Sequence, residues 1–195
     1  MTDLEKMRAG RWLHAVTPEI SAALRATEEL CFRLNRLPPS HREEREAILR
    51  EMFGHVGEGI CLHSPFHCDF GKQISIGDHF VGNFHLTILD EAPVTIGNHV
   101  YIGPNVGIYT VSHALHADQR NEGIMRSLPI RIEDNVWIGG HAVIMPGVTI
   151  GEGAVIGAGS VVTRDIPPQV VAAGNPCRVL RPIAEADRIA EEEMD

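Results

Sequence analysis

The sequence predicts a mainly β fold: a parallel β-helix of hexapeptide repeats, with a helical cap before it and a short helix after it. Two observations predict this fold class. Aliphatic residues recur every six positions, a pattern that is neither the 3.6-residue period of a helix nor the apolar–polar alternation of a strand. Glycine often follows the aliphatic residue, as at Gly97, Gly139 and Gly157. The aliphatic series in register is Ile96, Ile102 and Ile108, and then Ile132, Ile138, Ile144, Ile150, Ile156 and Val162.

The first segment, residues 1–57, is predicted to be a helical cap. Thr17-Pro18-Glu19 offers an N-cap hydroxyl, a proline at the first helical position and an acid in the first turn. Pro38-Pro39 separates this helix from a second one. Ser40-x-x-Glu43 resembles a capping box and predicts where the second helix begins.

Residues 58–182 form the predicted β-helix. Six residues make one flat side, and three sides close a triangular coil of about 18 residues. Each aliphatic side chain then points inward and stacks on its equivalent one coil away, about 4.8 Å from it. The small residue that follows permits a sharp corner. A second register, four residues behind, holds small or aliphatic residues: Val136, Ala142, Val148, Ala154 and Ser160.

Two interruptions break the period. From Ile88 to Ile96 the step is eight residues, so two extra residues are predicted to bulge from the coil around Asp90 and Glu91. Further on, steps of six from Ile108 reach alanine and two arginines, which cannot stack inward. Residues 113–129 are therefore predicted to leave the coil as an excursion loop, where function tends to lie.

The last segment and the composition exclude several classes of protein. Residues 183–195 are predicted to be a short polar helical tail, rich in acids. With a net charge of −9 the chain lacks the basic face that a nucleic-acid partner requires. No apolar run approaches a membrane span, and Met1–Gly10 is no secretory signal, so a cytoplasmic protein without a membrane partner is expected. The four cysteines have no zinc or redox spacing.

Short motifs along nearly the whole chain carry a resemblance to a known family. They are Glu5-Lys6-Met7-Arg8-Ala9-Gly10, Phe66-His67-Cys68-Asp69-Phe70-Gly71, Asn83-Phe84-His85-Leu86-Thr87-Ile88-Leu89-Asp90, Ser112-His113, Asn135-Val136-Trp137-Ile138-Gly139-Gly140, Pro146-Gly147-Val148-Thr149-Ile150-Gly151, and Gly174-Asn175-Pro176 with Arg178. Together they resemble the hexapeptide-repeat sugar O-acetyltransferases, including the maltose, galactoside and nodulation-factor acetyltransferases. The resemblance implies a left-handed coil, a homotrimer with active sites between subunits, and acetyl-CoA as the donor co-substrate, with no metal.

His113 is the predicted catalytic residue. A thioester is already activated, but a sugar hydroxyl is a poor nucleophile until its proton is removed. A histidine serves as a general base for that step and contributes about 10²–10⁴ in rate. His113 lies where the coil opens into the excursion, and the family motif points to the same residue. The alternative is an ordinary loop histidine. Nearby His116 is a weaker candidate, and His79, His85, His99 and His141 are expected on the outer surface.

The acceptor is expected to contact two groups of residues. Asn83 resembles the family's residue at the acceptor hydroxyl, and its amide both donates and accepts hydrogen bonds. Asp90, Glu91 and, more weakly, Asp69 are expected to accept hydrogen bonds from sugar hydroxyls. Met125 lies in the excursion and is expected to pack on the acceptor.

Galactoside-type members differ from this chain at two acceptor positions. They carry an acid where this chain has Ala15, and an aspartate where it has Glu91. These differences leave the particular sugar open.

The donor is expected to contact the repeat surface and a basic cluster. Trp137 precedes an inward residue, so its indole faces outward and suits either the pantetheine arm or a subunit interface. The backbone at Gly140 and Ala158 resembles coenzyme-contact positions, where a missing or small side chain lets a ligand approach. The residues predicted for the phosphate end are Thr163, Arg164, Arg178 and Arg181.

Three alternatives remain at the level of sequence. The first is an acetyltransferase of the same fold with another acceptor, such as an antibiotic or an amino-acid hydroxyl. The second is a metal-dependent hydratase that shares the coil, although no trio of histidines occupies coil-related positions. The third is a non-catalytic scaffold, which leaves His113, Trp137 and the arginines unexplained.

Overall fold

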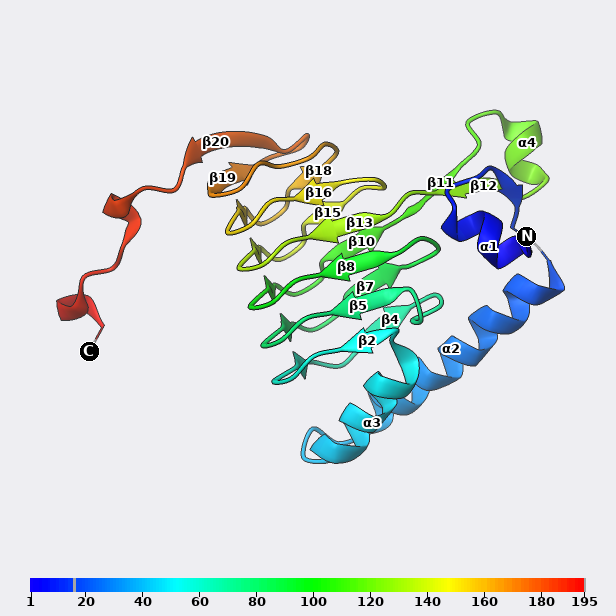
Figure 1. Cartoon of the computed structure of the whole chain (residues 1–195), viewed down its shortest axis with the longest axis horizontal. Helices are drawn as coiled ribbons and strands as arrows, with labels where there is room; N and C mark the ends of the chain where they lie inside the picture. The colour runs from blue at the N-terminus through cyan, green and yellow to red at the C-terminus, as the bar shows by residue number, and fades with distance from the viewer. Residues whose placement is uncertain (16, 195) are drawn as a thin grey trace.

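The computed structural model describes residues 1–15 and 17–194. A rod of stacked coils carries helices against its first coils and a tail beyond its last one (Figure 1). The helices are α1 (Asp3–Arg8), α2 (Pro18–Arg36), α3 (Arg42–Met52), α4 (Ala117–Asn121) and the 3-10 helices η1 (Glu185–Asp187) and η2 (Glu191–Glu193). The predicted fold class is confirmed.

Three sheets of short parallel strands form the sides of the rod. The first sheet contains β2 (His55–Val56), β5 (Ile74–Ile76), β8 (Val94–Ile96), β13 (Ile130–Ile132) and β16 (Thr149–Ile150). The second contains β3 (Cys61–Leu62), β6 (Val81–Gly82), β9 (Tyr101–Ile102), β14 (Trp137–Ile138), β17 (Val155–Ile156) and β19 (Val170–Ala173), with β20 (Arg178–Pro182) antiparallel at its end. The third contains β4 (Phe66–Cys68), β7 (Leu86–Leu89), β10 (Gly107–Tyr109), β15 (Val143–Ile144) and β18 (Val161–Val162).

The six-residue register is confirmed by the strand pairing. Ile138 pairs with Ile102 on one side and Ile156 on the other. All three side chains are buried in the single core that runs along the rod. Burying each isoleucine stabilises the fold by about 1.5–3 kcal/mol, so the stacked column is the main source of stability.

Close backbone approach explains the glycine that follows several of the inward residues. A Cβ on Gly103 would lie 2.5 Å from the backbone nitrogen of Gly140, and one on Gly139 would lie 2.5 Å from that of Ala158. Both distances are shorter than van der Waals contact allows. In these coils the corner position therefore has no room for a side chain.

Left-handed backbone conformations explain the histidines at another corner. His79 and His99 have φ of 56° and 52°, and Asn135 follows them in the same column with 60°. Their side chains face outward, as expected, and the two imidazole rings stack with centroids 4.7 Å apart. These residues take the strained corner position that asparagine and histidine tolerate better than most residues.

The helical cap differs in part from the expectation. Thr17 caps α2 as predicted, accepting a hydrogen bond from the Ile20 N–H at 3.3 Å. The predicted Ser40 capping box is wrong, because α3 has His41 as its N-cap and no side-chain hydrogen bond there. Two hydrogen bonds join Asn35 of α2 to the backbone of Phe66, at 2.8 and 2.9 Å, and so fix the cap on the first coil.

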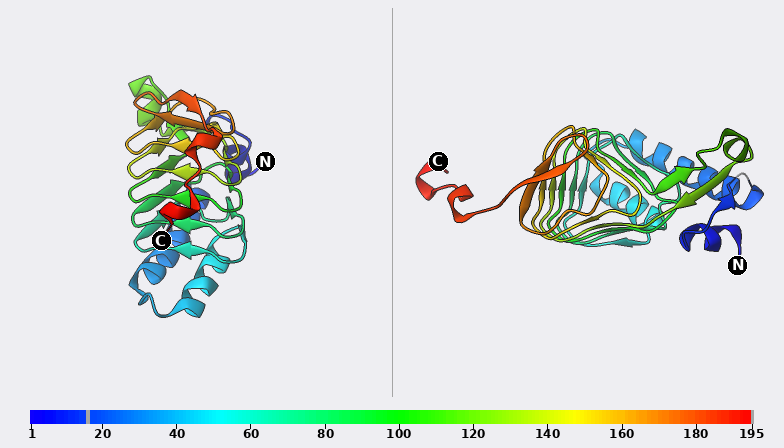
Figure 2. Two further views of the ribbon diagram at one scale, coloured as in Figure 1. Left: turned by 90° about the vertical axis from the view of Figure 1, so that its left-hand side faces the viewer. Right: turned by 90° about the horizontal axis from the view of Figure 1, so that it is seen from above.

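The C-terminal segment leaves the rod on the side opposite the N-terminal segment and α4 (Figure 2). The short helix predicted there is present as the two single turns η1 and η2. The antiparallel strand β20 just before it was not predicted. Its sequence has no alternation of buried and exposed residues that would predict a strand, because every residue of β20 is exposed.

We expect Ile138→Asp to abolish folding, because it places a carboxylate in the centre of the inward column. The control is Thr95→Asp, at an exposed position of the first sheet. Soluble expression and a cooperative thermal transition measure the outcome. An Ile138→Asp protein that melts like wild type contradicts the register.

Candidate active site

One corner of the rod is longer than the others in three consecutive coils. This elongated corner, between the third and first sheets, consists of residues 69–73, 90–93 and 110–129. The inward step across it is eight residues from Cys68 to Ile76 and again from Ile88 to Ile96. In the third coil the excursion leaves at the same corner. The first insertion was not predicted, although the sequence contains the eight-residue step from Cys68 to Ile76.

The excursion is a hairpin and not an irregular loop. Its strands β11 (Val111–His113) and β12 (Ile124–Ser127) pair antiparallel, and β1 (Leu13–His14) adds a third strand. The Leu128 N–H donates to the Thr110 carbonyl at 2.8 Å where the hairpin leaves the coil. The pairing thus begins at Val111, two residues before the predicted start.

His113 occupies a fixed place in this hairpin. Its backbone pairs with Met125, and Met125 pairs with Leu13 on the other side. Met125 is buried in a small apolar cluster with Leu13 and Phe70, whereas His113 is exposed. The cluster therefore fixes the strand on which the imidazole stands, next to the insertion that contains Phe70.

The predicted insertion at Asp90 and Glu91 is present, but both acidic side chains are buried within it. Asp90 is fully buried, and its Oδ1 accepts hydrogen bonds from the backbone N–H groups of Asp69 at 3.0 Å and Phe70 at 2.9 Å. The wider corner leaves backbone donors of the first coil without a strand partner, and the carboxylate satisfies them. Asp90 thus links the insertions of two coils. Glu91 is also buried.

A buried polar network supports this bulge from both sides. The Gln73 Nε2 donates to the carbonyls of Asp90 and Glu91, both at 2.8 Å. From the next coil, the Thr110 hydroxyl donates to the Leu89 carbonyl at 2.8 Å and accepts from the Ala92 N–H at 3.1 Å. Buried backbone groups of the insertion are therefore paired with neighbouring coils.

Two buried carboxyl groups at this corner, Asp90 and Glu91, have pKa values raised toward neutral pH. Burial raises the pKa of Glu91 to about 8, and the nearby Asp69 raises it further by charge repulsion and by accepting its proton in a hydrogen bond. Burial also raises the pKa of Asp90 to about 7, although the hydrogen bond from the Phe70 N–H lowers it. The pKa of Asp69 is raised by burial and lowered by its bond to Glu91. Asp69 and Glu91 thus form a pair that can both donate to and accept from a ligand hydroxyl.

The remaining acceptor residue and the donor residues lie at a different corner. Asn83 follows β6 at the corner between the second and third sheets, where its Oδ1 accepts from the Phe84 N–H at 2.8 Å. Gly140 and Ala158 belong to the same corner in later coils. Within the described residues neither Gly140 nor Ala158 donates its backbone N–H. Trp137 is 56% exposed on the adjoining second sheet, as predicted.

A single chain therefore divides the predicted site. His113, Met125, Asp69 and Glu91 lie at the elongated corner, whereas Asn83, Gly140 and Ala158 lie at the opposite edge of the third sheet. Both groups are predicted to belong to one site, which the resemblance implies to lie between subunits.

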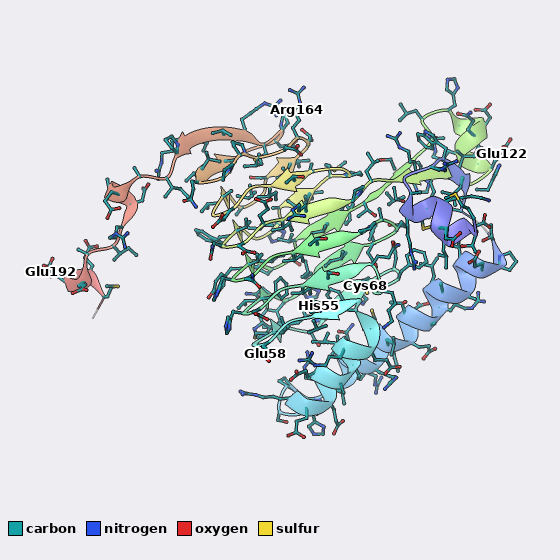
Figure 3. The ribbon with its side chains drawn as sticks, viewed as in Figure 1. His55, Glu58, Cys68, Glu122, Arg164 and Glu192 are labelled. Carbon is teal, nitrogen blue, oxygen red and sulfur yellow. The ribbon has the colours of Figure 1, made fainter. Side chains whose placement is uncertain are left out.

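The predicted phosphate residues gather near the last coil. Thr163 and Arg164 directly follow β18, and Arg178 and Arg181 lie on β20; all four are exposed. Figure 3 shows Arg164 at the end of the rod away from the helical cap. Arg181 already holds a partner, because it donates two hydrogen bonds to Asp187 at 2.6 and 2.8 Å.

Within residues 1–15 and 17–194, no group of three or more histidine, cysteine or acidic side chains is placed to hold a metal ion. Over the same ranges, no helix combines the length and apolar character needed to cross a membrane.

Comparison with known proteins defines the family. Residues 6–57 match the maltose acetyltransferase hexapeptide capping motif, and residues 129–164 match the bacterial transferase hexapeptide model of six repeats. The galactoside O-acetyltransferase of Escherichia coli K12 is 46% identical over 94% of this chain and 91% of its own length. The chain belongs to the hexapeptide-repeat O-acetyltransferases. It is an acyltransferase of the galactoside and maltose acetyltransferase branch.

Solved structures agree with this family assignment. The enzyme superposes on a galactoside acetyltransferase in complex with coenzyme A with a TM-score of 0.93, 45% identity, and coverage of 98% and 96% of the two chains. A maltose O-acetyltransferase from Clostridium difficile 630 gives 0.92 and 44%, with coverage of 95% and 99%. A Vibrio cholerae acetyltransferase complexed with acetyl coenzyme A gives 0.88 and 44%, with 95% and 100%. The predicted left-handed β-helix and the acetyl-CoA co-substrate are confirmed at the level of the family.

We expect Glu91→Gln to flatten the pH dependence of stability. The folded-state pKa of Glu91 is about 8 against an ordinary 4.5, so the unfolded chain releases the proton first. Stability from this group is complete below about pH 4 and is lost as the pH rises through about 8. Wild type should lose on the order of 2 kcal/mol of unfolding free energy between about pH 5 and 8 through Glu91.

Thermal or urea unfolding across that pH range measures the effect. The matched control is Glu58→Gln, at an exposed glutamate, which should retain the wild-type slope. Equal slopes for wild type and Glu91→Gln would show that Glu91 is ionised in the folded enzyme.

Proposed function

We propose that the enzyme transfers the acetyl group of acetyl-CoA directly to a hydroxyl of a sugar or oligosaccharide, with His113 as general base. The observation that carries this proposal is the position of His113. Its imidazole stands exposed on a strand fixed by the buried Met125 cluster, at the corner that also holds the Asp69–Glu91 pair. The proposed base, His113, and the carboxyl groups proposed to bind the acceptor hydroxyls, Asp69 and Glu91, thus lie at the same elongated corner.

The reaction follows from these positions. The imidazole of His113 accepts the proton of the acceptor hydroxyl as its oxygen attacks the thioester carbonyl. The N–H groups of Gly140 or Ala158, which have no partner within the described residues, are suited to bind the carbonyl oxygen as negative charge develops there. The C–S bond then breaks, and the His113 imidazolium returns the proton to the leaving sulfur. Both substrates react within one ternary complex.

The acceptor is proposed to lie against the elongated corner. The Asp69–Glu91 pair suits neutral hydroxyls, because one member donates while the other accepts. Asp90 is proposed to act as a positioning residue, since its Oδ1 holds the backbone of Asp69 and Phe70. A sugar acceptor is further supported by the names of the relatives, a galactoside and a maltose acetyltransferase.

The donor is proposed to lie along the second sheet. Trp137 offers an exposed indole for the pantetheine arm, and Gly140 leaves room, since a Cβ there would lie 3.0 Å from the Pro104 carbonyl oxygen. Thr163, Arg164 and Arg178 are suited to the phosphates. Arg181 can contribute only when it leaves Asp187. A cytoplasmic location belongs to the same proposal, because acetyl-CoA is available there.

The active unit is proposed to be a homotrimer with each site between two subunits. Two of the three faces of the rod support this arrangement. The second sheet presents Tyr101 and Trp137, 52% and 56% exposed, and the third presents Val143 and Val161. The first sheet presents polar residues such as Arg131. Apolar faces of this kind mark interfaces, and packing them together brings the two separated corners into contact across subunits.

We expect His113→Ala to lower kcat by about 10²–10⁴ with a smaller change in the KM of either substrate, because only the proton transfer is lost. Thiol release from acetyl-CoA, measured with a panel of sugars, reports the rate. His116→Ala, at an exposed histidine three positions along, is the matched control and should retain activity. Equal rates for His113→Ala and wild type would remove His113 as the base, and release without any sugar dependence would indicate another acceptor class.

A second experiment tests the shared site. His113→Ala and Asn83→Ala subunits, each inactive alone, should regain about a quarter of the wild-type rate when denatured, mixed in equal amounts and refolded. Restoration follows because one subunit supplies His113 and its neighbour supplies Asn83. His113→Ala mixed with Met125→Ala, from the same corner, is the control and should regain much less. No recovery in the first mixture would place both residues in one subunit.

A further inference from the structure

Two cysteine sulfur atoms meet where α2 packs on the first coil. The Sγ of Cys31, on α2, lies 3.9 Å from the Sγ of Cys68, the last residue of β4. Both are free thiols and both are buried. Neither sulfur has a part in the acetyl transfer proposed above. Figure 3 shows Cys68 at the end of the rod that the cap covers.

The surrounding structure holds the two sulfurs together. On one side of the pair, Asn35 of α2 makes two hydrogen bonds to the backbone of Phe66. On the other side, the Thr27 hydroxyl donates to the Phe70 carbonyl at 3.0 Å. The helix is thus fixed to the strand before and after the cysteines, so their contact is a property of the fold and not of two mobile side chains. A disulfide, with a bond of about 2.05 Å, requires the two sulfurs to approach by about 1.9 Å from their present separation of 3.9 Å.

A groove gives small molecules access to the pair. It encloses about 620 Å³ between α2 and β4. Cys31 and Cys68 line it together with the exposed Phe32 and Asp69 at its end. Cys61 and Cys177 do not line this groove.

We propose that Cys31 and Cys68 are a modification site: a hydroperoxide converts them into a reversible disulfide that ties the helical cap to the acceptor corner. The contact between the two sulfurs lowers the pKa of Cys31, and the same contact together with burial raises the pKa of Cys68. Either sulfur can donate in this contact, and Cys68 also lies 3.5 Å from the Met52 sulfur. We assign the attack to Cys31, and the same disulfide forms if Cys68 attacks first.

The chemistry balances with the peroxide as the only oxidant. The Cys31 thiolate attacks one peroxide oxygen, the O–O bond breaks, and the leaving hydroxide takes up a proton as water. The sulfur of Cys68 then attacks the resulting sulfenic acid of Cys31, the S–O bond breaks, and the Cys68 proton leaves with it as a second water. Two thiols are oxidised by two electrons and one peroxide is reduced. A dithiol reductant reverses the bond by exchange.

The functional consequence rests on the proposed function. Asp69 directly follows Cys68, so drawing Cys68 toward α2 moves one member of the Asp69–Glu91 pair. Oxidation should therefore change the acceptor KM by roughly threefold or more and leave the acetyl-CoA KM unchanged, because Trp137, Gly140 and Ala158 lie away from this corner and Thr163 and Arg164 lie at the far end of the rod.

The experiment uses the full chain with Cys61→Ser and Cys177→Ser, which leaves only the pair. After treatment with hydrogen peroxide and alkylation, intact mass should fall by about 2 Da relative to the unreacted chain. A peptide map should join the segments around residues 31 and 68, and dithiothreitol should reverse both. Closing this loop should raise Tm by about 10 °C. The matched control adds Cys31→Ala and should show neither the mass loss nor the Tm gain.

Other outcomes overturn the inference. Full alkylation of both thiols after peroxide would mean that they do not react, and a gain of about 16 or 32 Da without a cross-link would mean that Cys31 oxidises alone. A disulfide with an unchanged acceptor KM overturns the regulatory consequence. The mass result does not depend on the acetyl transfer, so loss of the general-base assignment leaves it standing.

Discussion

The register of inward side chains is the constraint on which the rest of this structure depends. Each coil must place an aliphatic residue over the one below, and the backbone bonds between coils hold only in that alignment. Extra residues cannot be absorbed inside a side of the triangle, so they leave at a corner. The three insertions all leave at the same corner and stack on one another. The inward packing register thus determines that the polar residues of the three insertions lie at one corner.

The buried acidic residues of that corner show how the fold provides hydrogen-bond partners for polar groups that are removed from solvent. Asp90 supplies acceptors to backbone donors that have no strand partner, while Gln73 and Thr110 pair the carbonyls of the same bulge. Desolvation is offset in part by these bonds and in part by protonation, which is why Glu91 keeps its proton near neutrality. The corner is rigid and weakly charged, properties that suit recognition of neutral hydroxyls.

The sequence was sufficient for features that repeat and insufficient for features that occur once. A fixed spacing of six predicted the burial of Ile138 and the exposure of Trp137, because the same geometric rule applies in every coil. The two-residue strand Leu13–His14 has no pattern of its own and exists only because β12 lies beside it. Asp90 turns inward because of unpaired donors in another coil, which spacing cannot reveal. The division of the candidate site between two corners follows from where chain segments meet in space.

The two ends of the rod differ from its sides in a way that limits how the molecule can grow. A stack of parallel coils has open strand edges at its top and bottom, and such edges invite further chains to add in line. Here α2 and α3 cover the first coil, and the antiparallel β20, which ends in Arg181 and Pro182, pairs with β19 at the last edge of the second sheet (Figure 1). In-line addition is therefore hindered by the cap at the first coil, and by β20 at the last edge of the second sheet. The flanks of the rod, where the second sheet exposes Tyr101 and Trp137, are the surfaces left open to a further copy of the chain.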